Sequence, residues 1–213
     1  MLYRTVLCDL DGTLIDSSQE IASAFRYALD QIVPGDVPQP AAIAQHIGKP
    51  LAQMISDLGY RLSRPQLTRF LEAYRAHYDA HGTGNIHVYP GVTETLSALN
   101  STVFGVVTTK APQHAQAALA HLGMAHFFRH IQGTTPNLRP KPAPDTILQA
   151  LTALQCDPAQ TIMVGDTPAD IQAGQAAGIK TCAVSYGFGN LQALNDTGPD
   201  YWITSFDELA HIV

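Results

Sequence analysis

Side chains that can hold a phosphate group and a divalent cation follow four separate apolar segments of the sequence. Asp9 and Asp11 come directly after the first segment and before Gly12. Because a turn at Gly12 breaks the strict alternation of a strand, both carboxylates can face one site. The other three groups are Thr108-Thr109-Lys110, Lys141 within Arg139-Pro140-Lys141-Pro142, and Gly165-Asp166 with Asp170.

The types of these residues indicate chemistry on a phosphate group. Asp9, Asp11 and Asp166 would be costly to place together in their ionised form unless a cation neutralises them. Oxygen ligands that leave positions for water and phosphate suit Mg²⁺. Lys141 can then supply a point charge, and the Thr108 hydroxyl a hydrogen bond, to the remaining phosphate oxygens. We therefore expect a Mg²⁺-dependent site.

Short apolar segments alternate with helical patterns along most of the chain. Apolar segments with β-branched residues predict strands within residues 2–10, 103–109, 161–165, 181–184 and 201–204. Between them, helical patterns lie at residues 91–99, 112–122, 144–154 and 168–177. This alternation predicts an α/β fold with a mainly parallel sheet, which binds ligands at the carboxyl ends of its strands.

One segment, residues 17–86, interrupts the alternation. It contains helical patterns but no convincing strand, at residues 18–32, 40–47, 51–58 and 65–80. An all-helical insertion after the first strand would cover the carboxyl ends of the strands. We therefore predict a core domain formed by residues 1–16 and 87–213 and a helical cap domain formed by residues 17–86.

The overall composition limits the classes of protein to be considered. The 213 residues include 12 Lys and Arg against 18 Asp and Glu, a formal net charge of −6. An acidic chain without a clustered basic patch is not expected to bind nucleic acid. No apolar stretch suits a signal peptide or a membrane span, and the three cysteines offer no disulfide framework. We expect a cytoplasmic monomer or homodimer with no membrane partner.

Taken in order, the polar motifs resemble those of the haloacid dehalogenase (HAD) superfamily phosphatases. The resemblance covers essentially the whole chain. The matching motifs are Asp9-Leu10-Asp11-Gly12-Thr13, Thr108, Lys141 and Gly165-Asp166-Thr167-Pro168-Ala169-Asp170. Segments similar to the phosphoglycolate phosphatase-like branch, which has a helical cap, are Asp11-Gly12-Thr13-Leu14-Ile15-Asp16-Ser17, Ile47-Gly48-Lys49-Pro50-Leu51 and Val88-Tyr89-Pro90-Gly91-Val92.

The resemblance implies both a fold and a reaction. The fold would be a doubly wound parallel-sheet (Rossmann-like) core with an all-helical cap inserted after the first strand. The reaction would be hydrolysis of a small phosphorylated metabolite, similar to phosphoglycolate, through an aspartyl-phosphate intermediate. Asp9 would be the nucleophile. Asp11 would be the acid and base, which requires it to be protonated in the substrate complex.

The resemblance also implies binding roles. Phosphate would be held by Thr108, Thr109 and Lys141, and Mg²⁺ by Asp9, the backbone carbonyl of Asp11, and Asp166, with Asp170 steadying the metal or its water. Many relatives have Asn in place of Thr109. A threonine still donates through its hydroxyl and its backbone amide, so we expect phosphate binding to be retained. Asp170 equally suits the first turn of the helix that follows it.

Substrate selection is expected to come from the cap. His46 and Lys49 are polar residues in a glycine-containing segment, and Lys49 could meet an anionic leaving group, although a surface role suits both equally well. Tyr74 and Tyr78 have helical spacing and are predicted to pack between helices.

Three alternatives to a metabolite phosphatase stay open at this point. A sugar phosphomutase would have a His soon after the first motif, which the stretch from Asp16 to Ile21 lacks. An inorganic pyrophosphatase has the same motifs. A non-catalytic module that binds a phosphate ligand would not need a nucleophile beside an acid.

Overall fold

A six-stranded parallel sheet forms the centre of the computed structural model, which describes residues 3–135 and 137–213. Its strands are β1 (Thr5–Cys8), β4 (Val103–Val107), β5 (Phe128–Gln132), β6 (Thr161–Gly165), β7 (Lys180–Val184) and β8 (Tyr201–Ile203). They lie in the order β5-β4-β1-β6-β7-β8. Because β1 lies between β4 and β6, the residues that follow these three strands meet at one edge of the sheet.

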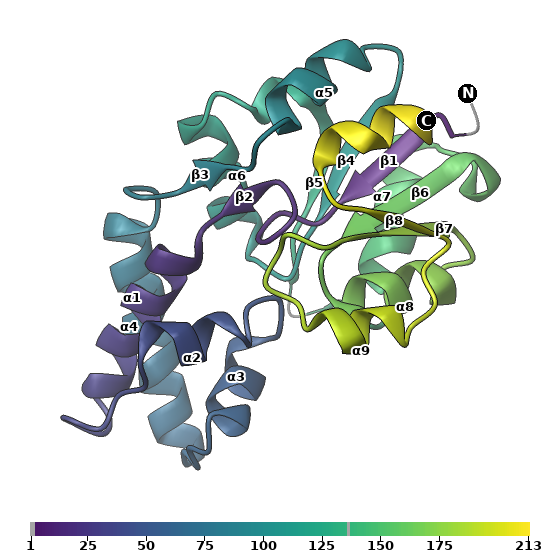
Figure 1. Cartoon of the computed structure of the whole chain (residues 1–213). Helices are drawn as coiled ribbons and strands as arrows, with labels where there is room; N and C mark the ends of the chain where they lie inside the picture. The colour runs from purple at the N-terminus through teal and green to yellow at the C-terminus, as the bar shows by residue number, and fades with distance from the viewer. Residues whose placement is uncertain (1–2, 136) are drawn as a thin grey trace.

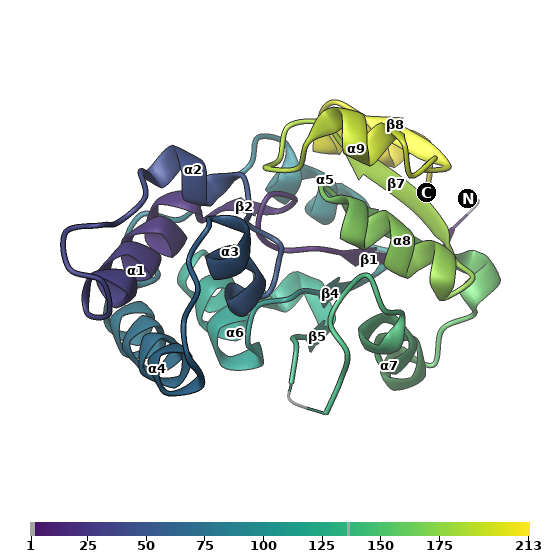
Figure 2. The same cartoon turned by 90° about the horizontal axis from the view of Figure 1, so that it is seen from below.

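Helices cover both faces of this sheet (Figures 1 and 2). The α-helices of the core are α5 (Val92–Ala98), α6 (Pro112–His121), α7 (Asp145–Leu154), α8 (Pro168–Ala176) and α9 (Leu191–Asn195), and the short 3-10 helices are η1 (Ala125–Phe127), η2 (Pro158–Gln160) and η3 (Phe206–His211). Val6 and Cys8 of β1 pack with α5, α6 and η3, whereas Leu7 packs with α7 and α8 on the other face.

An apolar strand that is buried on both faces is expected of a doubly wound parallel sheet. The predicted α/β fold class is therefore confirmed, with the all-helical insertion after its first strand.

The insertion has an apolar core of its own. Its helices are α1 (Ser18–Asp30), α2 (Pro40–Ala44), α3 (Leu51–Asp57) and α4 (Arg64–His81). Phe25 of α1 and Phe70 of α4 are fully buried and meet edge to face, with ring centroids 5.1 Å apart. Figure 1 shows this group of helices to one side of the sheet, beyond the carboxyl end of β1.

Two short strands, β2 (Ile15–Asp16) and β3 (His87–Val88), lie where the chain enters and leaves the insertion. They pair in an antiparallel manner, with Asp16 opposite His87. This pair ties together the two connections between the helices and the sheet. The boundaries of the core and cap domains, placed from the sequence at residues 16/17 and 86/87, stay a prediction.

Three strands are not anticipated by the sequence analysis, namely β2, β3 and β5. β2 and β3 have two residues each, too few for a periodic pattern. β5 is the edge strand, and its segment Phe-Arg-His-Ile-Gln is partly exposed, so it lacks the apolar run of a central strand. Within the described residues, every helix is too short or too polar to cross a lipid bilayer.

Candidate active site

The turn after β1 brings the first motif against the end of β6. Gly12 has φ = 91°, in the left-handed region that glycine adopts without strain. A Cβ atom at Gly12 would lie 2.3 Å from Asp166 Oδ2, so only glycine allows this close approach. Asp166 is fixed in place because it accepts hydrogen bonds from the Thr13 hydroxyl at 3.0 Å and the Phe188 backbone N–H at 2.8 Å.

Lys141 lies in the interior between two aspartates. Its Nζ atom is 3.0 Å from Asp9 Oδ1 and 2.5 Å from Asp170 Oδ1. It also donates a hydrogen bond of 3.0 Å to the Val107 carbonyl. Burial alone would lower the pKa of Lys141, but the negative charges of Asp170 and Asp9 together outweigh it and raise that pKa. Lys141 is therefore a fixed positive charge beside Asp9.

Three buried carboxylates, those of Asp9, Asp166 and Asp170, each place an oxygen within 4.8 Å of the others. Burial is the main cause that raises the pKa of Asp9 to about 7, and it also raises the pKa of Asp166. Lys141 supplies one positive charge against three carboxylates, so their full ionisation leaves two negative charges uncompensated. The buried Asp9 Oδ1 atom accepts no aligned hydrogen bond from the described residues. The cluster therefore fits a divalent metal ion.

The sequence leaves two positions open for Asp170, beside the metal site or in the first turn of the following helix. In the structure its side chain contacts both the acidic cluster and the start of α8. One carboxylate oxygen contacts Lys141, as part of the acidic cluster. The other accepts hydrogen bonds from the backbone N–H and the hydroxyl of Thr167, at 2.9 and 2.6 Å, and so caps α8. Asp170 thus anchors the start of α8 to the ammonium group that faces Asp9.

The expectation that Asp11 joins Asp9 and Asp166 in one carboxylate cluster is wrong for its side chain, because Asp170 is the third member of the cluster. The Oδ1 atom of Asp11 accepts a hydrogen bond from the Ser17 hydroxyl and lies 2.9 Å from Lys110 Nζ. Both partners of this ion pair are almost fully buried. The sequence analysis gives Lys110 no role of its own, although Lys110 directly follows Thr109. The turns after β1 and β4, which are adjacent strands, bring the two side chains together.

The two threonines after β4 have different surroundings. Thr108 is buried, and its Oγ1 atom accepts a hydrogen bond of 3.2 Å from the Lys110 backbone N–H, which leaves the hydroxyl hydrogen free to donate. Thr109 is half-buried and lines a cavity.

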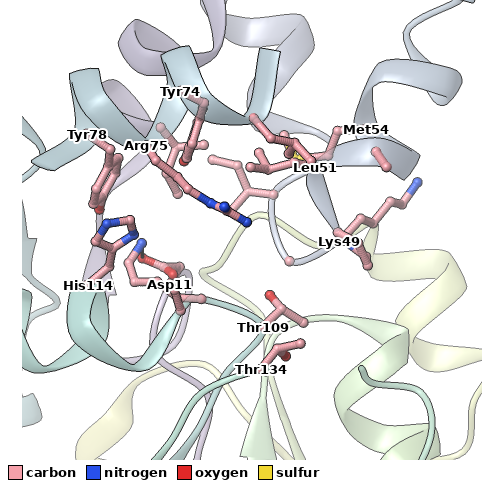
Figure 3. A pocket seen from close by; sticks show the side chains of 18 of the residues that line it. Asp11, Lys49, Leu51, Met54, Tyr74, Arg75, Tyr78, Thr109, His114 and Thr134 are labelled. Carbon is pink, nitrogen blue, oxygen red and sulfur yellow. Dashed lines mark ion pairs between the residues drawn. The ribbon is translucent and has the colours of Figure 1, made fainter. Parts of the chain in front are cut away.

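This cavity, about 380 Å³ in volume, lies between the inserted helices and the carboxyl ends of the strands (Figure 3). On the side of the core, its lining residues include Asp11, Thr109, Lys110, His114 and Thr134. On the side of the insertion, lining residues include Lys49, Leu51, Met54, Tyr74, Arg75 and Tyr78. Its volume lies in the range of small-molecule sites.

The family of the chain follows from comparison with known proteins. The model of the family described as haloacid dehalogenase-like hydrolase matches residues 6–184, a range that includes all four motifs and the insertion. The chain belongs to the haloacid dehalogenase-like hydrolases. The family resemblance inferred from the motifs is confirmed, and so is the prediction that the chain is an enzyme, a HAD-type phosphatase.

Relatives of this HAD chain match it over nearly its full length. It is 35% identical over 215 residues to the pyrophosphatase PpaX of Halalkalibacterium halodurans, covering 100% of this chain and 98% of that protein. It is 31% identical over 212 residues to the phosphoglycolate phosphatase of Aquifex aeolicus, covering 99% and 96%. The solved structure of a haloacid dehalogenase-like family hydrolase from Streptococcus pneumoniae has a TM-score of 0.89 and 32% identity, covering 99% of each chain.

Of His46 and Lys49, the two residues of the inserted helical segment predicted to contact substrate, one lines the cavity. Lys49 does so, but its ammonium group lies 2.6 Å from Asp57 Oδ2 and 3.3 Å from His46 Nδ1. Figure 3 shows that the ammonium group points away from the cavity. His46 is not a lining residue. Substrate contact by Lys49 and His46 stays a prediction.

Helix α4 contributes lining residues to the HAD site that the sequence analysis does not assign to it. Tyr74 and Tyr78 are buried and pack within the insertion, as predicted, but they also line the cavity. Arg75, between them, lines it as well. The periodicity of α4 marks its apolar face, but no signal in the sequence tells which residues overlap the core.

Proposed function

We propose that this protein is a Mg²⁺-dependent phosphomonoester hydrolase that acts on a small phosphorylated metabolite of the phosphoglycolate type through an aspartyl-phosphate intermediate. The observation that carries the proposal is the buried cluster of Asp9, Asp166 and Asp170 beside Lys141. Phosphoryl transfer depends mainly on in-line positioning and on the neutralisation of charge. Lys141 supplies one positive charge beside Asp9, and the carboxylates of the cluster can hold a divalent cation that would supply the rest.

In the proposed reaction, a carboxylate oxygen of Asp9 attacks the phosphorus atom, and the bond from phosphorus to the leaving oxygen breaks. Asp11, which is ion-paired with Lys110 in this structure, must take up a proton from solvent when the substrate binds, and it gives that proton to the leaving oxygen. Asp11 then takes a proton from water as the water attacks the aspartyl phosphate, which releases inorganic phosphate and restores Asp9. Lys141 and the hydroxyls of Thr108 and Thr109 would hold the phosphoryl oxygens throughout.

The metal ligands in this proposal are Asp9, the backbone carbonyl of Asp11, and Asp166, with Asp170 steadying the metal or its water. Bound Mg²⁺ would neutralise the carboxylates and the phosphoryl oxygens. Hard oxygen ligands and the uncompensated negative charge of the cluster support this choice of metal.

The helical segment 17–86 would act as a cap domain that selects the leaving group, because it forms one wall of the cavity beside Asp11. A second candidate substrate is inorganic pyrophosphate. It is supported by the 35% identity to a protein named pyrophosphatase, and its two linked phosphates need the same cluster.

The proposal is tested by measuring phosphate release from 2-phosphoglycolate, pyrophosphate and 4-nitrophenyl phosphate, in Mg²⁺ and after chelation with EDTA. We expect turnover that requires Mg²⁺ and that is abolished by Asp9→Asn, because the substitution removes the nucleophile and keeps its volume. The variant must be shown by mass spectrometry not to have deamidated. Turnover of Asp9→Asn within tenfold of the parent would exclude Asp9 as the nucleophile. Higher kcat/KM on pyrophosphate than on 2-phosphoglycolate would favour the second candidate.

A further inference from the structure

The basic side chains that line the cavity differ in whether they have an acidic partner. Three of them are paired: Lys110 Nζ lies 2.9 Å from Asp11, Lys49 Nζ 2.6 Å from Asp57, and His114 Nε2 2.6 Å from Asp79. Arg75 forms no ion pair and no hydrogen bond with any residue in the ranges 3–135 and 137–213. The cavity therefore holds one uncompensated guanidinium group.

Arg75 is placed to meet a ligand. Figure 3 shows its guanidinium group extending from α4 into the cavity, on the side opposite Asp11 and Thr109. Arg75 is exposed, so its guanidinium group is open to a ligand that enters from solvent. The neighbouring Tyr78 ring packs against His114 and Lys110 instead, with Lys110 Nζ 4.8 Å from its centroid.

We propose that Arg75 binds a second anionic group, carried on the leaving-group side of the substrate. A guanidinium group presents parallel N–H donors that match a carboxylate or a phosphate. The substrate class is a phosphomonoester whose leaving group carries that anion on a carbon skeleton, because the apolar side chains of Leu51, Met54 and Leu71 form the adjoining wall.

This inference rests on the proposed function, since it needs a phosphoryl group held at Asp9. It differs from the expectation for Lys49, the other cation of the inserted helices in this cavity. Lys49 must leave Asp57 before it can bind a ligand, whereas Arg75 loses no ion pair. Binding of the anionic group of the substrate should therefore depend more on Arg75 than on Lys49.

The test compares kcat/KM for three related substrates in the full-length protein. Ethyl phosphate has an uncharged leaving group, 2-phosphoglycolate has a carboxylate in place of the methyl group, and ethane-1,2-diol bisphosphate has a second phosphate. For Arg75→Met we expect a loss of about tenfold or more on at least one charged substrate, mainly through KM, and little change on ethyl phosphate. The charged substrate with the larger loss identifies the anion as carboxylate or phosphate.

Two further variants serve as controls. Arg69→Met removes an exposed arginine of the same helix that does not line the cavity, and it should resemble the parent on all three substrates. Lys49→Met should have a smaller effect than Arg75→Met. Thermal unfolding of each variant checks that the fold is kept.

Three results would overturn the inference. The first is an equal loss, or no loss, on all three substrates for Arg75→Met. The second is a larger selective loss for Lys49→Met. The third is a parent enzyme that releases no phosphate from any of the three in Mg²⁺, which contradicts the proposed function itself and is recognised without any variant.

Discussion

The close approach between Gly12 and Asp166 makes a specific prediction about metal binding. In Gly12→Ala the new Cβ atom would start 2.3 Å from Asp166 Oδ2, whereas 3.4 Å is the shortest ordinary contact. The Asp166 carboxylate or the loop that follows Asp9 must therefore move by about 1 Å. A displacement of that size in a site that depends on position can cost about 100-fold in rate. We expect kcat/KM to fall by this order and the half-saturating Mg²⁺ concentration to rise.

The same substitution also strains the backbone, and this effect must be separated from the displacement. Alanine in the left-handed region costs about 1–2 kcal/mol of stability relative to glycine. Gly35→Ala is the matched control, because Gly35 has φ = 77° and no atom lies within 4 Å of the position of its Cβ. It should lose similar stability in urea unfolding but keep the activity and the Mg²⁺ titration of the parent.

The measurements are steady-state phosphate release at a series of Mg²⁺ concentrations and urea unfolding of both variants. If Gly12→Ala and Gly35→Ala lose equal stability and share one Mg²⁺ titration curve with the parent, the contact with Asp166 does not control metal binding. The steric argument would then be refuted, whatever the loss of stability.

Three further substitutions test the other proposed roles. Asp11→Asn should reduce turnover less for aryl phosphates than for alkyl phosphates, because good leaving groups need less protonation; equal losses in kcat/KM would contradict an acid role. Asp166→Ala should raise the half-saturating Mg²⁺ concentration about tenfold or more, and a titration that overlays the parent's would place the metal elsewhere. Lys141→Ala should cost about 2–4 kcal/mol in kcat/KM, from the loss of a fixed charge; a loss confined to stability in urea unfolding would argue for a structural lysine.

The fold is predictable where one pattern decides the structure. Central strands such as β1 and β6 are buried on both faces, so their apolar runs are clear in the sequence. The edge strand β5 is not predictable in this way, because its exposed Arg129 and half-buried His130 interrupt the run. Its assignment depends on pairing with β4, which is a tertiary contact.

Two of the three members of the acidic cluster, Asp9 and Asp166, are predictable for a related reason. Asp9 and Asp166 follow adjacent parallel strands, so the sheet itself brings their carboxylates together, and the structure places Asp170 and Lys141 beside them. The ion pair of Asp11 with Lys110 is less accessible from sequence, because it depends on the conformation of two turns rather than on the order of strands.

The cap wall of the cavity is the part that sequence patterns could not supply. Arg64, Arg69 and Arg75 are all exposed arginines of α4, and helical periodicity treats them alike. Only Arg75 of the three lines the cavity, because the choice depends on how the inserted helices lie over the strand ends. The relative positions of the core motifs follow from the order of the strands along the chain. The contacts that the inserted helices make with the cavity follow instead from how these helices pack against the core. The residues proposed to select the leaving group are therefore those for which the three-dimensional structure adds most to the sequence.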